Sequence, residues 1–314
     1  MSSFSAIIVS YNSAEVLDAC LRSLGSTPAI VVDNASADDS VRVAGAYPNV
    51  QVIANTENRG FAAAVNQGVC ASEAEAFLLL NPDTELLPGT LEALQSLPHR
   101  LAGGRLVDRE GHDQAGFGIR RFPTASTFVL ETLGINRLWA SNPVNARYRY
   151  FDLDLNKPGE VEQPAGAFLF FRREVWKRVG GFDEDFQPIW FEDVDFCLRA
   201  NQMGVSAFYD PALVARHFGG HSIRPLTASC RAGYWYVSLL RYASKHFRPG
   251  AFRGVSMAVA LGAVPRLILD SIRQRSLKPV AAYSKIIRLA ILSLFSPELA
   301  RPALALGEAG RIRG

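Results

Sequence analysis

Two acidic stretches hold the residues of this chain that are best suited to chemistry. The first is Asn81-Pro82-Asp83, which follows the apolar run LLL, so a carboxylate stands where a buried strand should end. Mg²⁺ and Mn²⁺ accept such oxygen ligands together with water and substrate phosphates, so one or two protein ligands can hold the ion. Asp83 is therefore a candidate metal ligand, and the competing interpretation is an ordinary turn cap.

The second stretch is Glu192-Asp193, with Asp195 close behind and Trp190-Phe191 in front. Acidic neighbours raise the proton affinity of a carboxylate, which suits a general base acting on a hydroxyl group. Acidic residues also favour helix N-termini, but that preference does not explain the two aromatic residues. His217, in the sequence HFGGH, is a candidate ligand for a metal or a phosphate within a glycine loop.

The elements that must position these residues alternate between strands and helices. Four apolar runs, at residues 4–10, 28–33, 49–54 and 75–80, are separated by helical segments. This order predicts βαβ units and a largely parallel sheet, which binds ligands outside the carboxyl ends of its strands. The polar residues expected at that rim are Tyr11, Asn12, Asp33, Asn34, Asn58, Arg59, Gly60, Asn81 and Asp83.

Several enzyme classes are disfavoured by missing motifs. No GxGxxG follows the first strand and no GxxxxGK[ST] occurs, which argues against dinucleotide-dependent and P-loop enzymes. A sugar-1-phosphate nucleotidyltransferase should carry a basic glycine-rich loop where this chain has Tyr11-Asn12-Ser13. A non-catalytic subunit that binds a sugar nucleotide or a membrane stays open as an alternative.

Charge divides the chain near residue 230. Residues 1–230 have a net charge of −8, and residues 231–314 have a net charge of +11. The uncharged run 254–265 is shorter than the roughly 20 residues of a membrane-spanning helix. Basic amphipathic helices on the anionic inner face of the cell membrane are expected, with a helical cap on the body as the alternative. We expect a cytoplasmic, peripheral protein without a secretory signal and without a nucleic-acid partner.

Seven stretches, taken together, resemble family 2 glycosyltransferases with the GT-A fold, specifically the bacterial rhamnosyltransferase-like branch. They span roughly residues 4–222 and read AIIVSYNS, VVDNASADDS, ENRGFAAAVNQG, LLLNPDTEL, PAGAFLFFRREVWKRVGGFDEDF, WFEDVDFCLR and HFGGHS. The resemblance implies a catalytic domain over 1–230, with a nucleotide-sugar half at 1–98 and an acceptor half at 99–230. Residues 231–314 would form the basic helical tail.

The resemblance also implies a role for each rim residue. The nucleotide-sugar would contact Tyr11, Asn12, Asp33, Asn34, Arg59, Gly60 and Asn81. Mg²⁺ or Mn²⁺ would bind Asp83 and His217, although Asn81 departs from the family's two-acid DXD motif. Asp193 would be the general base beside Glu192, and the acceptor would lie at Gly166, Ala167 and Trp190.

The implied reaction is metal-dependent transfer with inversion, most simply of L-rhamnose from dTDP-L-rhamnose. The acceptor would be a saccharide, free or linked to polyprenyl diphosphate, in cell-surface polysaccharide synthesis. Donors such as a UDP-hexose or UDP-galactofuranose are the alternatives.

Overall fold

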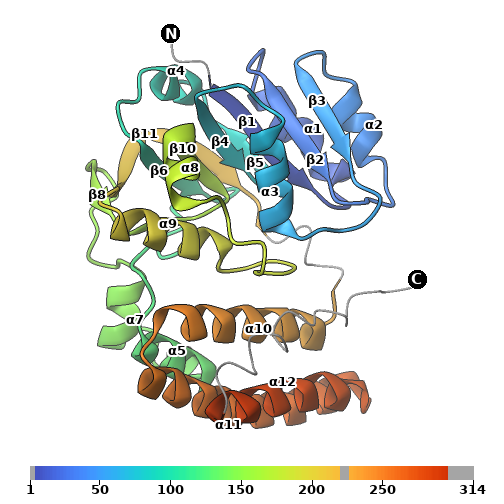
Figure 1. Cartoon of the computed structure of the whole chain (residues 1–314), viewed down its shortest axis with the longest axis vertical. Coiled ribbons are helices and arrows are strands. Elements are labelled where there is room, and N and C mark those ends of the chain that lie inside the picture. The colour runs from blue at the N-terminus through green and yellow to red at the C-terminus, as the bar shows by residue number, and fades with distance from the viewer. Residues whose placement is uncertain (1–3, 220–225, 296–314) are drawn as a thin grey trace. The chain divides into compact units, whose positions relative to one another are not determined.

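The computed structural model of the chain describes residues 4–219 and 226–295, which form two compact units (Figure 1). The sheet unit comprises residues 4–122, 149–184 and 192–219, and the helical unit comprises 123–148, 185–191 and 226–295. Two internal segments, 123–148 and 185–191, group with the helices after residue 226. The predicted domain boundary at residue 230 stays a prediction. The division into nucleotide-sugar and acceptor halves stays a prediction.

The sheet unit is built on a nine-stranded sheet, with strands in the order β3-β2-β1-β4-β10-β6-β11-β5 and with β8 beside β11. The strands are β1 Phe4–Ser10, β2 Ala29–Asp33, β3 Val50–Ala54, β4 Ala76–Leu80, β5 Thr84–Leu86, β6 Leu101–Val107, β8 Gly159–Val161, β10 Phe168–Arg172 and β11 Ala207–His217. A separate ribbon pairs β7 Ile119–Arg120 with β9 Gln163–Pro164.

Strand direction confirms the predicted mostly parallel sheet. β1, β2, β3 and β4 are mutually parallel, and β6 and β11 point the same way, because β10 runs antiparallel to both β4 and β6. The four N-terminal apolar runs therefore form strands as expected. β1, β2 and β4 are buried along their whole length, which is why their sequences are continuously apolar rather than alternating.

Helices cover both faces of this sheet (Figure 1). Alternate residues of β1 point to opposite faces, with Ala6 and Ile8 in one core cluster and Ile7 and Val9 in the other. The first cluster includes residues of α1, α2 and α4, and the second includes residues of α3, α8 and α9. These helices are α1 Ala14–Ser23, α2 Ser40–Gly45, α3 Phe61–Cys70, α4 Thr90–Gln95, α8 Arg173–Val179 and α9 Glu192–Gln202.

The helical unit combines three short helices from mid-chain with three long helices from the C-terminal region. Its members are α5 Ala125–Thr132, α6 Ile135–Leu138, α7 Pro143–Tyr148, α10 Ala228–His246, α11 Pro249–Gln274 and α12 Lys278–Phe295. Phe128 of α5 packs against Phe191, Tyr242 and Phe247, with ring centroids 5.4–5.7 Å apart. The unit therefore has an aromatic core to which α5, the 185–191 segment and the end of α10 all contribute.

Candidate functional site

The loops after β1 and β2 are joined by a polar network. Asp33 is 1% exposed, and its carboxylate accepts hydrogen bonds from the backbone N–H of Ser36 at 2.9 Å and from the Ser36 hydroxyl at 2.5 Å. The Ser36 hydroxyl oxygen accepts from the N–H of Asn12 at 2.8 Å, and the Asn12 amide oxygen accepts from the N–H of Ala37 at 2.8 Å. Tyr11, one residue earlier, is exposed. The network fixes the shape of the rim around Tyr11.

A second network ties the loop before α3 to the same rim. The Asn34 side chain donates to the Gly60 carbonyl at 3.1 Å and accepts from Asn55 at 3.0 Å. Gly60 has a φ of 83°, in the left-handed region that favours glycine, and it stands directly before the first residue of α3. Arg59 is exposed on this anchored turn. The structure thus brings Asn12, Asp33, Asn34 and Gly60 to one end of the parallel strands, as predicted from strand order.

The candidate metal site lies where β5 meets β11. β4 ends at Leu80, the Asn81-Pro82-Asp83 turn follows, and Thr84 of β5 pairs with His217 of β11. Asp83 and His217 are both 4% exposed, and His217 Nε2 lies 3.6 Å from Asp83 Oδ1. His217 is the last residue of β11 rather than part of the glycine loop expected from HFGGH, and His221 lies outside the described residues.

The tautomer and protonation state of the His217 ring follow from the groups around it. Gln114 donates from Nε2 to the His217 carbonyl at 2.7 Å, which turns Gln114 Oε1 toward His217 Nδ1 at 3.0 Å. Nδ1 must then carry the proton, so Nε2 presents its lone pair toward Asp83. Burial lowers the pKa of His217, and the Asp83 charge only partly opposes this effect, so the neutral ring is favoured.

These residues fit a divalent cation. Within the part of the chain that the structure describes, His217 Nε2 is buried and has no hydrogen-bond partner. A buried lone pair beside a carboxylate oxygen is an arrangement that a cation would satisfy, and metal-binding histidines usually donate their other N–H as His217 does here. The ring also stacks on Phe117, with centroids 5.1 Å apart. Gln114 and Phe117 carry no sequence signal, because they lie about 100 residues before His217 in a stretch without periodicity.

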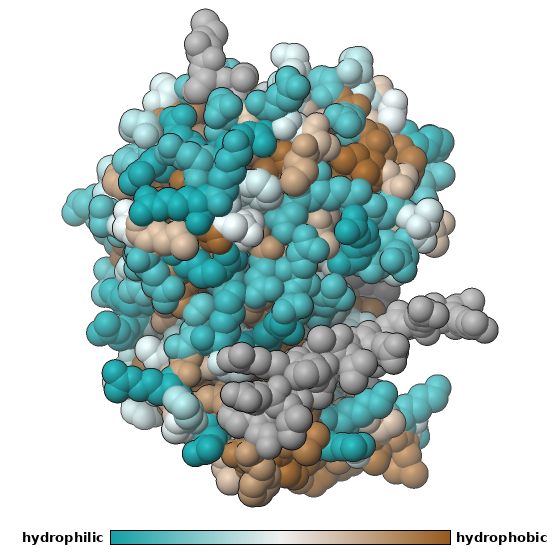
Figure 2. Space-filling view, in the orientation of Figure 1, coloured by the Kyte–Doolittle hydropathy of each residue, from teal (hydrophilic) through white to brown (hydrophobic). Residues whose placement is uncertain are grey.

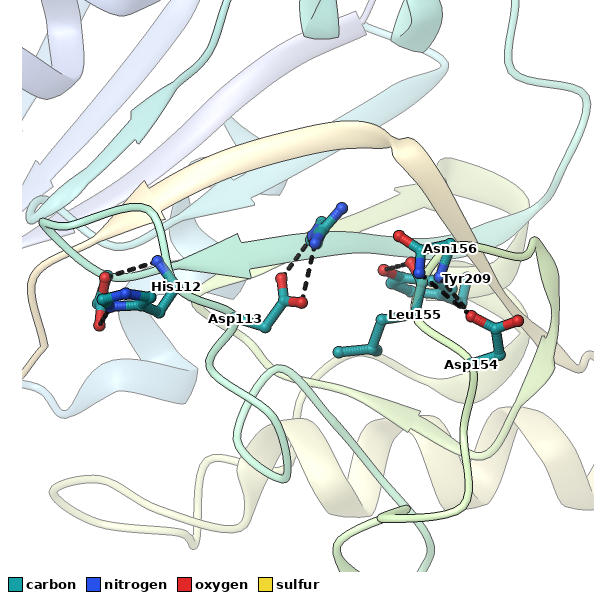
Figure 3. Close-up of polar contacts among 8 residues, drawn as sticks. His112, Asp113, Asp154, Leu155, Asn156 and Tyr209 are labelled. Atoms are coloured by element: carbon teal, nitrogen blue, oxygen red, sulfur yellow. Dashed lines mark hydrogen bonds and ion pairs between the residues drawn. The ribbon is translucent and has the colours of Figure 1, made fainter.

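The loop that presents Gln114 is itself held in place (Figure 3). Asp108 accepts from the N–H of His112 at 2.8 Å, and Asp113 pairs with Arg105, whose Nη2 lies 2.8 Å from Oδ2. The Gln114 N–H donates to the Leu106 carbonyl at 2.9 Å. Asp108 and His112 also form, with Glu110, a group whose ligand atoms lie close together, but the Asp108 carboxylate is engaged with the turn's own N–H groups.

The candidate base, Asp193, lies in the first turn of α9 against the loop between β9 and β10. Its Oδ2 accepts from the Gly166 N–H at 2.8 Å and from Gln163 Nε2 at 3.3 Å, and its Oδ1 accepts from the Val194 N–H at 2.8 Å. Burial raises the pKa of the Asp193 carboxyl, and the hydrogen bonds from Gly166 and Val194 oppose the rise, as does the Arg120 charge. A carboxylate with a raised pKa that is still hydrogen-bonded in one orientation suits proton transfer.

The neighbouring acids differ in environment. Asp195 is fully buried and bonds to Arg199 at 2.6 Å, and Arg199 also donates to the carbonyls of Val179 and Gly181. Asp195 is therefore part of the packing between α9 and the end of α8. Glu192 is 5% exposed, and its predicted catalytic role stays a prediction.

The predicted acceptor residues fall in different places. A Cβ at Gly166 would lie 3.1 Å from the Asp193 Cβ, so glycine allows the loop to approach the carboxylate closely. The Ala167 carbonyl accepts from the Asn81 N–H at 3.2 Å. Trp190 belongs to the helical unit, where its φ is 82°, and its role at the acceptor stays a prediction.

Residues 166–167 connect the two acidic stretches. The Gly166 N–H binds Asp193, and the next carbonyl, that of Ala167, binds the turn that carries Asp83. This link exists because β10 lies beside β4, with Phe168 opposite Leu80. Two carboxylates that are 110 residues apart in the sequence are thereby attached to the same short backbone segment.

Comparison with known proteins yields one family and several relatives. Residues 5–180 match the family described as Glycosyl transferase family 2. The chain is 27% identical over 263 residues to the N-acetylglucosaminyl-diphospho-decaprenol L-rhamnosyltransferase of Mycobacterium tuberculosis, a match that covers 76% of this chain and 84% of the relative. It is 28% identical over 180 residues to the rhamnosyltransferase WbbL of Escherichia coli K12, covering 55% and 63% of the two chains.

Solved structures share the fold at lower identity. The mannosyltransferase PcManGT from Pyrobaculum calidifontis, solved in complex with GDP-Man and Mn²⁺, has a TM-score of 0.51 and 16% identity, covering 98% of this chain and 87% of that chain. S. aureus TarS 1-349 has a TM-score of 0.50 and 15% identity, covering 91% and 90%. These likenesses confirm the predicted GT-A fold class with its C-terminal helices.

Proposed function

The chain belongs to glycosyl transferase family 2, and on that premise we propose that it transfers L-rhamnose from dTDP-L-rhamnose with inversion. The acceptor we propose is a sugar hydroxyl of a saccharide linked to polyprenyl diphosphate. Two relatives support this choice, since one is an N-acetylglucosaminyl-diphospho-decaprenol L-rhamnosyltransferase and another is a rhamnosyltransferase. The protein would work at the cytoplasmic face of the cell membrane, in cell-surface polysaccharide synthesis.

The observation that carries the proposal is the connection through Gly166 and Ala167. It attaches the candidate base, Asp193, to the turn that carries the candidate metal ligand, Asp83. A transferase needs these two functions on opposite sides of one reacting carbon, because the base serves the incoming hydroxyl while the cation serves the departing diphosphate. A protein that only bound a nucleotide would need no carboxylate base held by directed hydrogen bonds.

In the proposed reaction, the Asp193 carboxylate accepts the proton of the acceptor hydroxyl, while the hydrogen bonds from Gly166, Gln163 and Val194 hold the carboxylate in one orientation. The acceptor oxygen forms a bond to the anomeric carbon, and the bond from that carbon to the diphosphate oxygen breaks, with its electron pair leaving on the nucleoside diphosphate. Asp83 and the Nε2 of His217 would hold Mg²⁺ or Mn²⁺, which when bound neutralises the negative charge of the leaving diphosphate. One displacement at the anomeric carbon inverts its configuration.

The rim residues would bind the donor. Tyr11 and the network around Asp33 would hold the base and ribose, and Arg59 would lie near the diphosphate. Asn12, Asn34, Gly60 and Asn81 act mainly through the shape they give the loops, since each takes part in a hydrogen bond within the rim or the turn.

The test is a donor screen by release of the nucleoside diphosphate, with Mg²⁺ or Mn²⁺ and a short-chain polyprenyl-diphosphate saccharide. We expect turnover with dTDP-L-rhamnose to exceed turnover with UDP-galactofuranose or a UDP-hexose. Asp193→Asn should lower turnover by at least about 100-fold while dTDP still binds. Glu174→Gln, at an exposed acid on α8, is the matched control and should be active.

Two outcomes would contradict the proposal. Equal turnover of Asp193→Asn and wild type would remove Asp193 from the base role. Tight dTDP binding without release from any donor would favour the non-catalytic alternative.

A further inference from the structure

Helix α11 has one face that is built into the protein. Phe252, Val255, Val259 and Ala263 are at most 1% exposed. At Gly262 the helix approaches α5 so closely that a Cβ would lie 2.1 Å from the Thr132 carbonyl oxygen. This face is therefore tightly packed within the helical unit.

The other face of α11 is apolar and exposed. Met257, Leu261, Val264, Ile268 and Ile272 recur at intervals of three and four residues, which places them on one stripe of the helix. Each is 43–67% exposed. We call these five residues the α11 stripe, and Figure 2 shows hydrophobic surface gathered over α11 and α12. Large contiguous apolar surfaces are rarely left exposed to solvent in soluble proteins. An exposed surface of this kind therefore indicates an interaction site.

The stripe is bordered by positive charge. Exposed basic residues of α11, α12 and the turn between them are Arg253, Arg273, Arg275, Lys278, Lys285 and Arg288. Residues 249–295 contain seven basic residues and one acid, Asp270. That acid accepts a hydrogen bond from the Tyr283 hydroxyl at 2.7 Å. The border is complementary to an anionic surface, as expected of a helix that binds acidic lipid.

The contacts of the packed face of α11 bear on whether the helix lies on a membrane or crosses it. Among the described residues, α11 is long and apolar enough to span a bilayer. Spanning would expose to lipid the Arg266 side chain, which donates to the Tyr236 hydroxyl at 2.5 Å and to the Glu131 carbonyl at 3.0 Å. It would also separate Gly262 from α5. Both contacts survive if the helix lies in the plane of the interface with only the α11 stripe in the acyl region.

We propose that the α11 stripe and its basic border form a membrane-docking surface that places α11 flat in the headgroup region of an anionic bilayer. This surface is supported by the exposure of the five apolar residues of the α11 stripe and by the positive charge of the residues that border it. Its use in reaching a lipid-linked acceptor rests on the proposed transferase function. Because the helical unit takes residues from 123–148 and 185–191 as well as from the C-terminal region, point substitutions test the surface better than truncation.

The experiment is co-sedimentation of the full chain with phosphatidylcholine vesicles, with and without phosphatidylglycerol. We expect binding to the phosphatidylglycerol vesicles, and release by high salt or alkaline carbonate. Leu261→Asp with Ile268→Asp should lower partitioning by roughly 100-fold, since two apolar side chains are lost and two charges would enter the interface. Val41→Asp with Met203→Asp, at exposed apolar residues of the sheet unit, adds the same charge and should bind like wild type.

Three results would overturn the proposal. The first is equal binding of the stripe variant and the wild type. The second is resistance to carbonate, which would mean that the helix spans the bilayer. The third is absence of vesicle binding together with a dimer that only the stripe substitutions dissociate, which would mean that a second copy covers the stripe. None of these measurements involves sugar transfer, so a failure here is separate from a failure of the proposed function.

Discussion

The Gln163 side chain offers a direct test of how the candidate base is tuned. Gln163 is 2% exposed, and its Nε2 donates to the Pro164 carbonyl at 2.9 Å and to Asp193 Oδ2 at 3.3 Å. Its Oε1 is buried and has no hydrogen-bond partner among the described residues. Leucine has a similar volume and would keep the packing of β9 while removing the donor to the carboxylate.

The expected effect follows from the geometry. A hydrogen bond to an ionised group is worth about 1.5–3 kcal/mol, and the 3.3 Å separation places this one below that range, at about 1 kcal/mol. One pH unit corresponds to about 1.36 kcal/mol, so Gln163→Leu should raise the pKa of Asp193 by about 0.7 pH unit. The substitution and the burial of Asp193 therefore shift the pKa of this carboxyl in the same direction, upward. A base works ionised, so activity should fall at low pH and be regained at higher pH.

The assay is the initial rate of nucleotide release against pH, at saturating donor and acceptor, with thermal unfolding measured alongside. The acid limb of the Gln163→Leu profile should move up by about 0.7 pH unit, with an unchanged plateau. Gln163→Glu should move the limb further, because a second carboxylate repels ionisation of the first. An acid limb that superimposes on that of the wild type would refute the reasoning. A uniform rate loss with a lower Tm would assign Gln163 a structural role only.

Three further predictions concern the metal site and the packing. His217→Ala should weaken Mn²⁺ binding in the presence of dTDP by at least about tenfold, measured by electron paramagnetic resonance; unchanged binding would exclude the ring as a ligand. Arg199→Met removes the guanidinium from the buried carboxylate of Asp195, so urea unfolding should show a loss of about 3–5 kcal/mol. Replacing both residues with apolar ones should cost less, and an equal loss would argue against that ion pair. Gly262→Leu should lower the Tm, because the side chain meets backbone; Gly254→Leu, which points into open space, should not. A tolerated Gly262→Leu would mean that α11 does not pack as described.

The strands and rim of the N-terminal half could be predicted because their signals are local. Each apolar run is short, continuous and followed by polar residues, so strand type and strand end are both visible in the sequence. Asp33 and Asp83 could be placed at the rim for that reason alone.

The remaining features depend on pairing between distant segments. β5 is only three residues long and forms by pairing with β11, which lies more than 125 residues later in the chain. The sequence around Asp83 therefore contains no local pattern that predicts this strand. The insertion of β10 between β4 and β6, antiparallel to both, is equally invisible in local sequence. The sequence does not predict Gln114 as a site residue for the same reason, because its partner, the His217 ring, belongs to β11. The two internal segments of the helical unit have weak periodicity and gain their structure from helices that come later.

The discontinuous helical unit has a consequence for biosynthesis. Gly262 leaves the ribosome about 130 residues after Thr132, the α5 residue that it contacts. At roughly 5–20 residues per second, α5 is synthesised roughly 6–26 s before its partner helix. During that interval Phe128 has none of its later aromatic neighbours on α10, and the sheet unit is already largely translated. Nascent chains should therefore carry an uncovered α5 that a chaperone could bind, and the translation of α10 and α11 would end that exposure.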